Sequence, residues 1–256
     1  MKTLLLCLTP LLAIAADQTP VERLFDGKLN ASQRANACFE LRGNAEPDVV
    51  SAMGKALEDP AVLSCAADNL RIAGAQNPGA IDALKQALTS RDAEVRAAAV
   101  RRLGSFQKSE LLDSIAQAAK DENLLVATNA LSGLVEYQDP AVAPMTIPYL
   151  AALASRGGMI GDMALDRLAQ LQSAMALGIA RELLLSSQVP DQLYAMRVIG
   201  AFGDASDLAQ LAKIATSSPE SLSQRARGFG FMPAINIARA AQSAMESIRG
   251  RISSAN

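Results

Sequence analysis

The sequence has no histidine and no tryptophan among its 256 residues, and aromatic residues make up only 4% of it. Histidine is the commonest general base, the usual partner of a catalytic serine or cysteine and the commonest zinc ligand, so most hydrolytic and zinc-dependent chemistries lack a required group. Few aromatic rings also means few platforms on which nucleic-acid bases could stack. We therefore expect no catalytic residues, no metal site, no cofactor and no enzymatic activity.

An excess of charge of either sign is also missing. The chain carries 24 basic and 26 acidic side chains, and half of its residues are hydrophobic. A chain of this composition has enough apolar surface to fold. Nucleic-acid binding favours a basic stripe and a high isoelectric point, whereas the sequence pI is 5.3. We therefore interpret Arg96, Arg101 and Arg102 as solvated positions on a helix and expect no nucleic-acid partner.

The N-terminus has the three parts of a signal peptide. Lys2 gives a short positive region, residues 4–15 form an apolar run, and Ala13-Ile14-Ala15 is a small-x-small cleavage pattern. Two alternatives are a buried N-terminal helix and a lipid anchor on Cys7.

We predict that residues 1–15 are a signal peptide, cleaved after Ala15 or Ala16, and that the protein is exported to a periplasmic or extracellular location. The rest of the sequence lacks an apolar run of about 20 residues, the length that spans a bilayer as a helix. We therefore expect no membrane span in the mature protein.

A short pattern recurs along the chain at intervals of 29, 33, 31, 34, 31 and 49 residues. It consists of alanine followed four positions later by leucine or isoleucine, which places both side chains on one face of a helix. Such regular spacing indicates a repeat architecture. The pattern occurs at Ala37/Leu41, Ala66/Leu70, Ala99/Leu103, Ala130/Leu134, Ala164/Leu168, Ala195/Ile199 and Ala244/Ile248.

Most intervals also contain a second amphipathic helix after a turn. Its apolar residues have the spacing of one helix face, as in Ile81/Leu84/Leu88, Leu111/Leu112/Ile115, Leu177/Ala180/Leu184 and Leu208/Leu211/Ile214. Each repeat is therefore predicted to be a pair of helices, and stacked pairs bury the faces that one pair leaves open. The 49 alanines suit close helix packing. No stretch has the alternation of a β-strand, so essentially no sheet is expected.

The segment from Asp92 to Gly104 resembles the first helix of a HEAT repeat, in the short bacterial form also seen in phycobilin-lyase-like proteins. Matching positions in the neighbouring repeats are Asp59, Val62, Ala66 and Leu70, and then Val126, Ala130 and Leu134. The resemblance implies an all-α fold, an α-solenoid of about six to seven stacked helix pairs over residues 31–251. Residues 16–30 would cap the stack, with a helix starting at Thr19-Pro20, and residues 252–256 would be a frayed tail.

Two carboxylates are candidates for chemistry. Asp162 and Asp166 are four residues apart and so share a helix face, but two ligands alone do not make a metal site. We interpret Asp162 as a cap or dipole partner at the N-terminus of a helix that starts after Gly161.

Cys38 and Cys65 are the two cysteines of the mature sequence. One follows the repeated alanine and the other precedes it, so they point to opposite flanks of equivalent helices in adjacent repeats. An exported protein meets an oxidising compartment, and we predict a Cys38–Cys65 disulfide. The alternative is a pair of buried thiols that point apart.

The long last interval predicts an inserted loop at about residues 218–235. It combines arginine with large apolar side chains, which are enriched in protein interfaces. We predict that a protein partner docks on Arg225, Arg227, Phe229, Phe231 and Met232. A second connection, at Met159 and Ile160, is predicted as an additional contact. The alternative is that these apolar side chains fold back and cap the core.

Together these features predict an exported scaffold or adaptor that binds a protein through its concave face or its inter-repeat loops. One alternative is a lyase-like enzyme acting on a bound tetrapyrrole or similar ligand, which would need a deep pocket with converging carboxylates and arginine. Another is a structural protein of the cell envelope. The sequence does not identify the partner.

Overall fold

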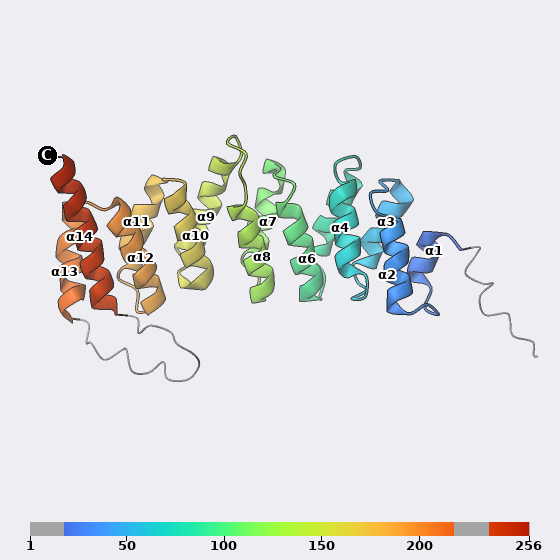
Figure 1. The fold of residues 1–256 in the computed structure, drawn as a ribbon, viewed down its shortest axis with the longest axis horizontal. Coiled ribbons are helices and arrows are strands. Elements are labelled where there is room, and N and C mark those ends of the chain that lie inside the picture. Colours follow the sequence, from blue (N-terminus) through green and yellow to red (C-terminus); the bar gives the residue numbers. More distant parts are fainter. Residues whose placement is uncertain (1–17, 218–235, 256) are drawn as a thin grey trace, which may run out of the picture. The chain divides into compact units, whose positions relative to one another are not determined.

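The computed structural model describes residues 18–217 and 236–255 (Figure 1). Within these ranges every regular element is a helix, and no strand is present. The chain divides into two compact units, Met1–Glu136 and Tyr137–Asn256. The predicted signal peptide and the predicted insertion lie outside the described residues.

The first unit is a row of antiparallel helix pairs that follows a short N-terminal helix. In chain order its elements are α1 (Pro20–Phe25), α2 (Ala31–Glu40), α3 (Pro47–Ala56), α4 (Leu63–Ala73), α5 (Gly79–Ala87), α6 (Ala93–Gly104), the 3-10 turn η1 (Ser109–Leu111), α7 (Leu112–Ala118) and α8 (Leu124–Val135). The first helices of successive pairs, α2, α4, α6 and α8, pack side by side (Figure 1). The second helices α3 and α5 also pack on each other.

The second unit has the same kind of packing. Its elements are η2 (Ala143–Thr146), α9 (Ile147–Ala154), α10 (Gly158–Gln170), α11 (Ala174–Leu183), α12 (Val189–Phe202), η3 (Ala205–Asp207), α13 (Leu208–Ser217) and α14 (Ile237–Ala255). Helix α12 contacts both α10 and α14, and α13 packs on α14. The all-α solenoid class predicted from the repeats is thus confirmed.

Side-chain caps explain where several helices begin. Thr19 and Glu22 form a capping box at α1, in which the Thr19 hydroxyl accepts a hydrogen bond from the Glu22 amide and the Glu22 carboxylate accepts one from the Thr19 amide. Asn30 and Gln33 form a second capping box at α2. These contacts satisfy amide groups that have no partner inside the first turn of a helix.

The repeated alanine and leucine positions form the core. Each pair lies on the first helix of a repeat or on α14, except that Leu41 directly follows the end of α2. All fourteen side chains are buried: Ala37, Leu41, Ala66, Leu70, Ala99, Leu103, Ala130, Leu134, Ala164, Leu168, Ala195, Ile199, Ala244 and Ile248. The small residues allow close contact. A Cβ atom built on Gly200 of α12 would lie 3.2 Å from the Cα atom of Ala244 on α14. The repeat period therefore marks the positions where neighbouring helices meet.

Two of the arginines that we interpreted as solvated form ion pairs. Arg96 on α6 holds the Asp121 carboxylate with two hydrogen bonds, Nε to Oδ2 at 2.8 Å and Nη2 to Oδ1 at 3.0 Å. The Arg96 guanidinium keeps the pKa of Asp121 below its usual value. Arg102 pairs with Asp68 on α4 at 2.9 Å. Only the exposed Arg101 fits the interpretation of a solvated position, because Arg96 and Arg102 form ion pairs with residues outside their own helix.

Helix α14 is held on the end of α12 by Arg251. This side chain donates hydrogen bonds to the carbonyl oxygens of Gly200 and Gly203, the latter at 2.7 Å. Carbonyl groups at a helix C-terminus lack partners inside the helix, so a cation stabilises them there. Helix α14 continues to Ala255 and so includes residues 252–255 of the predicted tail.

Candidate functional site

A cavity of about 610 Å³ lies between α3 and α5 in the first unit. Its lining consists of Pro47, Val50, Ser51, Gly54, Lys55, Glu58, Asn77, Gly79, Ala83, Gln86, Ala87, Thr89 and Ser90. A Cβ atom on Gly54 would lie only 3.3 Å from the Cβ of Ala83, so small side chains bring the two helices together beneath the cavity. The lining combines this apolar base with hydroxyl, amide and charged groups.

A second cavity of about 420 Å³ adjoins the first on the side of α1. It is lined by Val21, Phe25, Asp48, Ser51, Ala52 and Lys55. Ser51 and Lys55, both exposed on α3, line both cavities, and we call the two cavities together the α1–α3–α5 groove. Phe25 contributes a half-exposed aromatic ring, with 49% of its surface accessible.

Hydrogen bonds fix the rim of this groove at two places. Asn77 donates to the Ala45 carbonyl at 2.9 Å and accepts the Gly79 amide at 3.0 Å, which sets the start of α5. The Ser90 hydroxyl donates to Glu58 at 3.3 Å and so links the segments that follow α5 and α3. Lys55 is exposed and supplies the one cation of the groove. Such a surface is suited to binding a peptide by hydrogen bonds, apolar contact and one charge.

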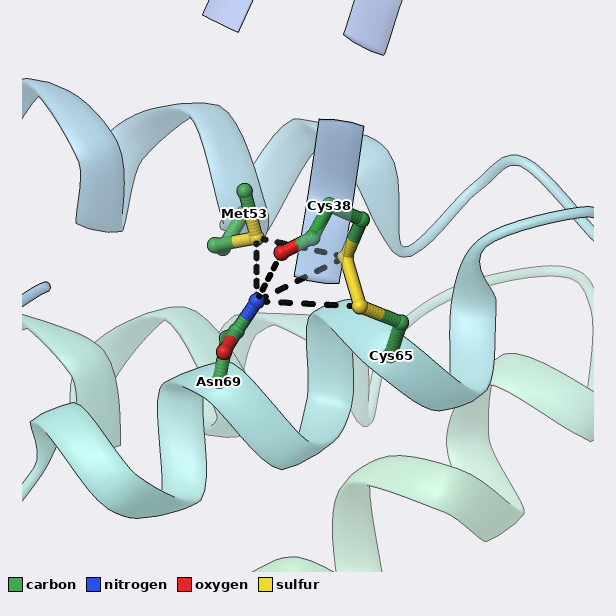
Figure 2. Close-up of a disulfide and its surroundings, with 4 residues drawn as sticks. All are labelled: Cys38, Met53, Cys65 and Asn69. Atoms are coloured by element: carbon green, nitrogen blue, oxygen red, sulfur yellow. Dashed lines mark hydrogen bonds between the residues drawn. A yellow bond between two sulfur atoms is a disulfide. The ribbon is translucent and has the colours of Figure 1, made fainter. Parts of the chain in front are cut away.

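A disulfide joins Cys38 on α2 to Cys65 on α4, as predicted (Figure 2). The Cα atoms are 6.3 Å apart, and 27 residues separate the two cysteines in the sequence. The side of α2 that carries Cys38, just after Ala37, therefore faces the side of α4 that carries Cys65, just before Ala66. Asn69 is buried beside the disulfide and donates to the Cys38 carbonyl at 2.9 Å.

The second predicted contact site is not a loop. Met159 and Ile160 lie in the first turn of α10, because α9 ends at Ala154 and α10 begins at Gly158. Gly157 and Gly158 both have positive φ, a conformation that glycine adopts without strain. These two glycines let the chain turn sharply, so the connection between α9 and α10 is shorter than the sequence suggests. Met159 is nevertheless half exposed. The predicted contact residues Arg225, Arg227, Phe229, Phe231 and Met232 lie outside the described residues.

Asp162 is not a helix cap, which corrects the sequence interpretation. It is the fifth residue of α10, it is 1% exposed, and its Oδ1 atom has no hydrogen-bond partner. Burial, together with the charge of Asp191, raises the pKa of Asp162 to about 6. The residue that holds the turn is Asp191, which accepts the Gly158 amide at 2.8 Å and the Ser186 hydroxyl at 2.7 Å.

The sequence reasoning missed the α1–α3–α5 groove. Ser51, Lys55 and Gln86 have no motif that distinguishes them from other exposed polar residues on helices.

The described residues contain neither a cluster of metal ligands of the usual kinds nor a membrane-spanning helix. Nowhere in residues 18–217 and 236–255 do three or more Cys, Asp or Glu side chains gather in a way that could hold a metal ion. Across the same ranges, none of the helices combines the length and the hydropathy needed to cross a membrane.

Comparison with known proteins identifies HEAT repeats at residues 81–157. Curated proteins give no match. Among solved structures, human deoxyhypusine hydroxylase in complex with glycerol is 18% identical, with 90% of this chain and 95% of that chain covered and a TM-score of 0.39. A designed armadillo repeat protein in complex with the peptide (KR)4 is 14% identical, with coverage of 90% and 99% and a TM-score of 0.42.

The family match begins in α5 and extends past α9, and it includes the segment that carries the resemblance in the sequence. Residues 81–157 therefore match HEAT repeats, and the resemblance noted in the sequence is confirmed over these residues.

Proposed function

We propose that the chain is an exported HEAT-repeat scaffold that binds a protein partner in the α1–α3–α5 groove. The observation that carries this proposal is that Ser51 and Lys55 of α3 line both cavities. Two neighbouring recesses, one lined by α1 and α3 and the other by α3 and α5, thus share residues of α3. An extended segment of a partner could follow the groove from Phe25 to Gln86.

The chemistry of the lining supports a protein as the occupant. Serine, threonine, asparagine and glutamine groups suit the amides of a peptide backbone, and Lys55 suits a carboxylate. Aromatic residues such as Phe25 are enriched in the core of protein interfaces. The groove therefore offers both the polar and the apolar contacts that a peptide needs.

The lyase-like alternative finds less support in this groove. A site for a tetrapyrrole or a similar acidic ligand would bring carboxylates and arginine together in one pocket. The linings of the two cavities contain one carboxylate each, Glu58 and Asp48, and no arginine. A structural role in the envelope makes a different prediction, namely that the protein stays with the cell-wall fraction after washing at high salt.

Export is supported by the signal-peptide pattern of residues 1–15 and by the Cys38–Cys65 disulfide, which is typical of oxidising compartments. Intact-mass measurement of the protein recovered outside the cytoplasm tests it. A mature N-terminus at Ala16 or Asp17 supports export, whereas a retained Met1 or a lipid mass on Cys7 contradicts it.

Binding is tested by filling the groove. Ser51→Arg puts a long side chain at a position that lines both cavities, and Ser64→Arg is a matched control at an exposed serine on α4 that lines neither cavity. We expect the protein partner captured from an envelope extract to be lost with Ser51→Arg and kept with Ser64→Arg. Equal capture by both variants would exclude the groove as the contact.

The inserted segment is a second candidate contact, together with Met159 and Ile160. The half-exposed Met159 is the observation that favours it. Replacing residues 228–232 with a Gly/Ser linker separates the two possibilities. Loss of the partner without a change in melting temperature supports docking there, and a lower melting temperature with the partner retained supports the core-capping alternative.

A further inference from the structure

Three sulfur atoms from three helices meet inside the first unit (Figure 2). Cys38 comes from α2, Met53 from α3 and Cys65 from α4. The sulfur atoms of Cys38 and Met53 are 3.9 Å apart, and the Cys38 sulfur is bonded to that of Cys65. Cys38 and Met53 are fully buried, whereas Cys65 is partly exposed. The buried side chain of Asn69 lies beside these three sulfur atoms.

The amide of Asn69 shows that the three sulfurs face a common point. Its Nδ2 atom lies 3.5 Å from the Cys38 sulfur, 3.5 Å from the Met53 sulfur and 3.7 Å from the Cys65 sulfur. An amide NH₂ has two hydrogens, and one of them is directed at the Cys38 carbonyl at 2.9 Å. The second hydrogen is shared weakly among the three sulfur atoms. The sulfur atoms therefore keep lone pairs that can bind another partner.

Reduction of the disulfide would convert this cluster into a set of metal ligands. A small dithiol that attacks the partly exposed Cys65 sulfur forms a mixed disulfide there and expels the Cys38 thiolate, which lies beside the Asn69 amide. The second thiol of the reagent then releases Cys65. The dithiol is oxidised to its cyclic disulfide, and Cys38 and Cys65 each gain one electron and one proton.

We infer that the dithiol form of this cluster is a binding site for Cu(I), with Cys38, Cys65 and Met53 as ligands. Thiolate and thioether are soft ligands, and this combination selects Cu(I). Three sulfurs in a plane around an ion, at the roughly 2.3 Å of a metal–thiolate bond, are about 4 Å apart. The Cys38–Met53 separation of 3.9 Å already meets this requirement. Binding releases the two thiol protons, and Asn69 stays near the sulfurs as an outer hydrogen-bond donor.

Anaerobic titration of the full chain with Cu(I), in competition with the chelator bicinchoninate, tests this site. All proteins carry Cys7→Ser, so that two thiols remain of the three cysteines in the sequence. The disulfide is reduced with dithiothreitol, which is removed before the titration. We expect the reduced chain to bind one Cu(I), and the oxidised chain to bind none.

Met53→Leu is the decisive variant, because it keeps the size of the side chain and removes the sulfur. We expect it to weaken Cu(I) binding by at least about tenfold, and we expect X-ray absorption at the copper edge to count three sulfur neighbours in the parent and two in the variant. Met159→Leu, at a half-exposed methionine in the other unit, is the control and should change neither result. Equal affinity and equal sulfur counts in Met53→Leu, or no Cu(I) binding by the reduced parent, would overturn the proposal.

Discussion

The backbones of Gly104 and Gly133 touch where α6 packs on α8. A Cβ atom built on Gly104 would lie 2.6 Å from the Cα atom of Gly133, a distance at which the helices must shift apart. A Cβ atom on Gly133 would lie 3.3 Å from the Cα atom of Gly104 and 3.4 Å from the Ile115 side chain, which is tight but close to an ordinary contact. The spacing of these two repeats therefore depends mainly on the glycine at position 104.

Gly104→Ala should destabilise the protein more than Gly133→Ala. Alanine favours a helix over glycine by about 1 kcal/mol, but at position 104 the clash with backbone outweighs this gain, and overpacking of this kind costs about 1–3 kcal/mol. Urea unfolding of the two variants measures the difference. Equal stability, or a more stable Gly104→Ala protein, would mean that α6 and α8 do not meet at these glycines.

Arg96→Lys should lower the free energy of unfolding by about 1–2 kcal/mol, because lysine cannot make the two parallel hydrogen bonds of the guanidinium. Arg101→Lys on the same helix is the matched control, since Arg101 is exposed, and its effect should stay within about 0.5 kcal/mol. Chemical unfolding of both variants at pH 7 provides the comparison. If the two substitutions cost the same, the Arg96–Asp121 pair contributes nothing to stability.

Protonation of Asp162 should raise the free energy of unfolding of the protein as the pH falls from 7 to 5. Its pKa is raised to about 6 in the folded state, first by burial and then by the charge of Asp191. In the unfolded chain the carboxyl ionises near its ordinary value of 3.8, so the folded state holds a proton that the unfolded state has lost. The charged form therefore costs stability, up to about 3 kcal/mol at neutral pH.

Asp162→Asn removes this titration without changing the shape of the side chain. The variant should be more stable than the parent at pH 7, and the difference should shrink toward pH 5. Asp166→Asn is the control on the same helix, where the carboxylate pairs with Arg197 at 2.6 Å. Unfolding curves at the two pH values measure the effect, and a difference that does not change with pH would show that Asp162 does not titrate in this range.

Reduction of the Cys38–Cys65 disulfide should lower the free energy of unfolding by about 3 kcal/mol, since the bond closes a long loop between the first two repeats. The comparison is made in a Cys7→Ser chain, with and without reductant. Thiol labelling of the unfolded, unreduced protein should find no free sulfur. Two labelled sulfurs would show that the disulfide does not form.

The repeat architecture was predictable because it depends on burial. Within each unit, the Ala-x-x-x-Leu pairs have a common cause, the contact between successive first helices, and so their period survives in the sequence. The Cys38–Cys65 pair could be proposed from their positions on either side of this pattern. Which flank faces the next repeat depends on how the repeats stack, and this required the structure.

Polar positions could not be predicted in the same way. The position of Asp162 after Gly161 suggests a helix cap. The turn is instead made at Gly157 and Gly158, where the Gly158 amide donates a hydrogen bond to Asp191, 33 residues further on. The groove at Ser51 and Lys55 depends on which exposed residues of α3 and α5 flank a recess. Neither relationship leaves a local pattern in the sequence.

Site-specific photo-crosslinking tests the proposed function most directly. A photoreactive amino acid at position 51, inside the α1–α3–α5 groove, is compared in living cells with the same amino acid at position 64 on α4. The account predicts one discrete crosslinked protein outside the cytoplasm from position 51 and none from position 64. A crosslink of equal strength from position 64, or no crosslink from position 51 while the partner still co-purifies, would contradict it.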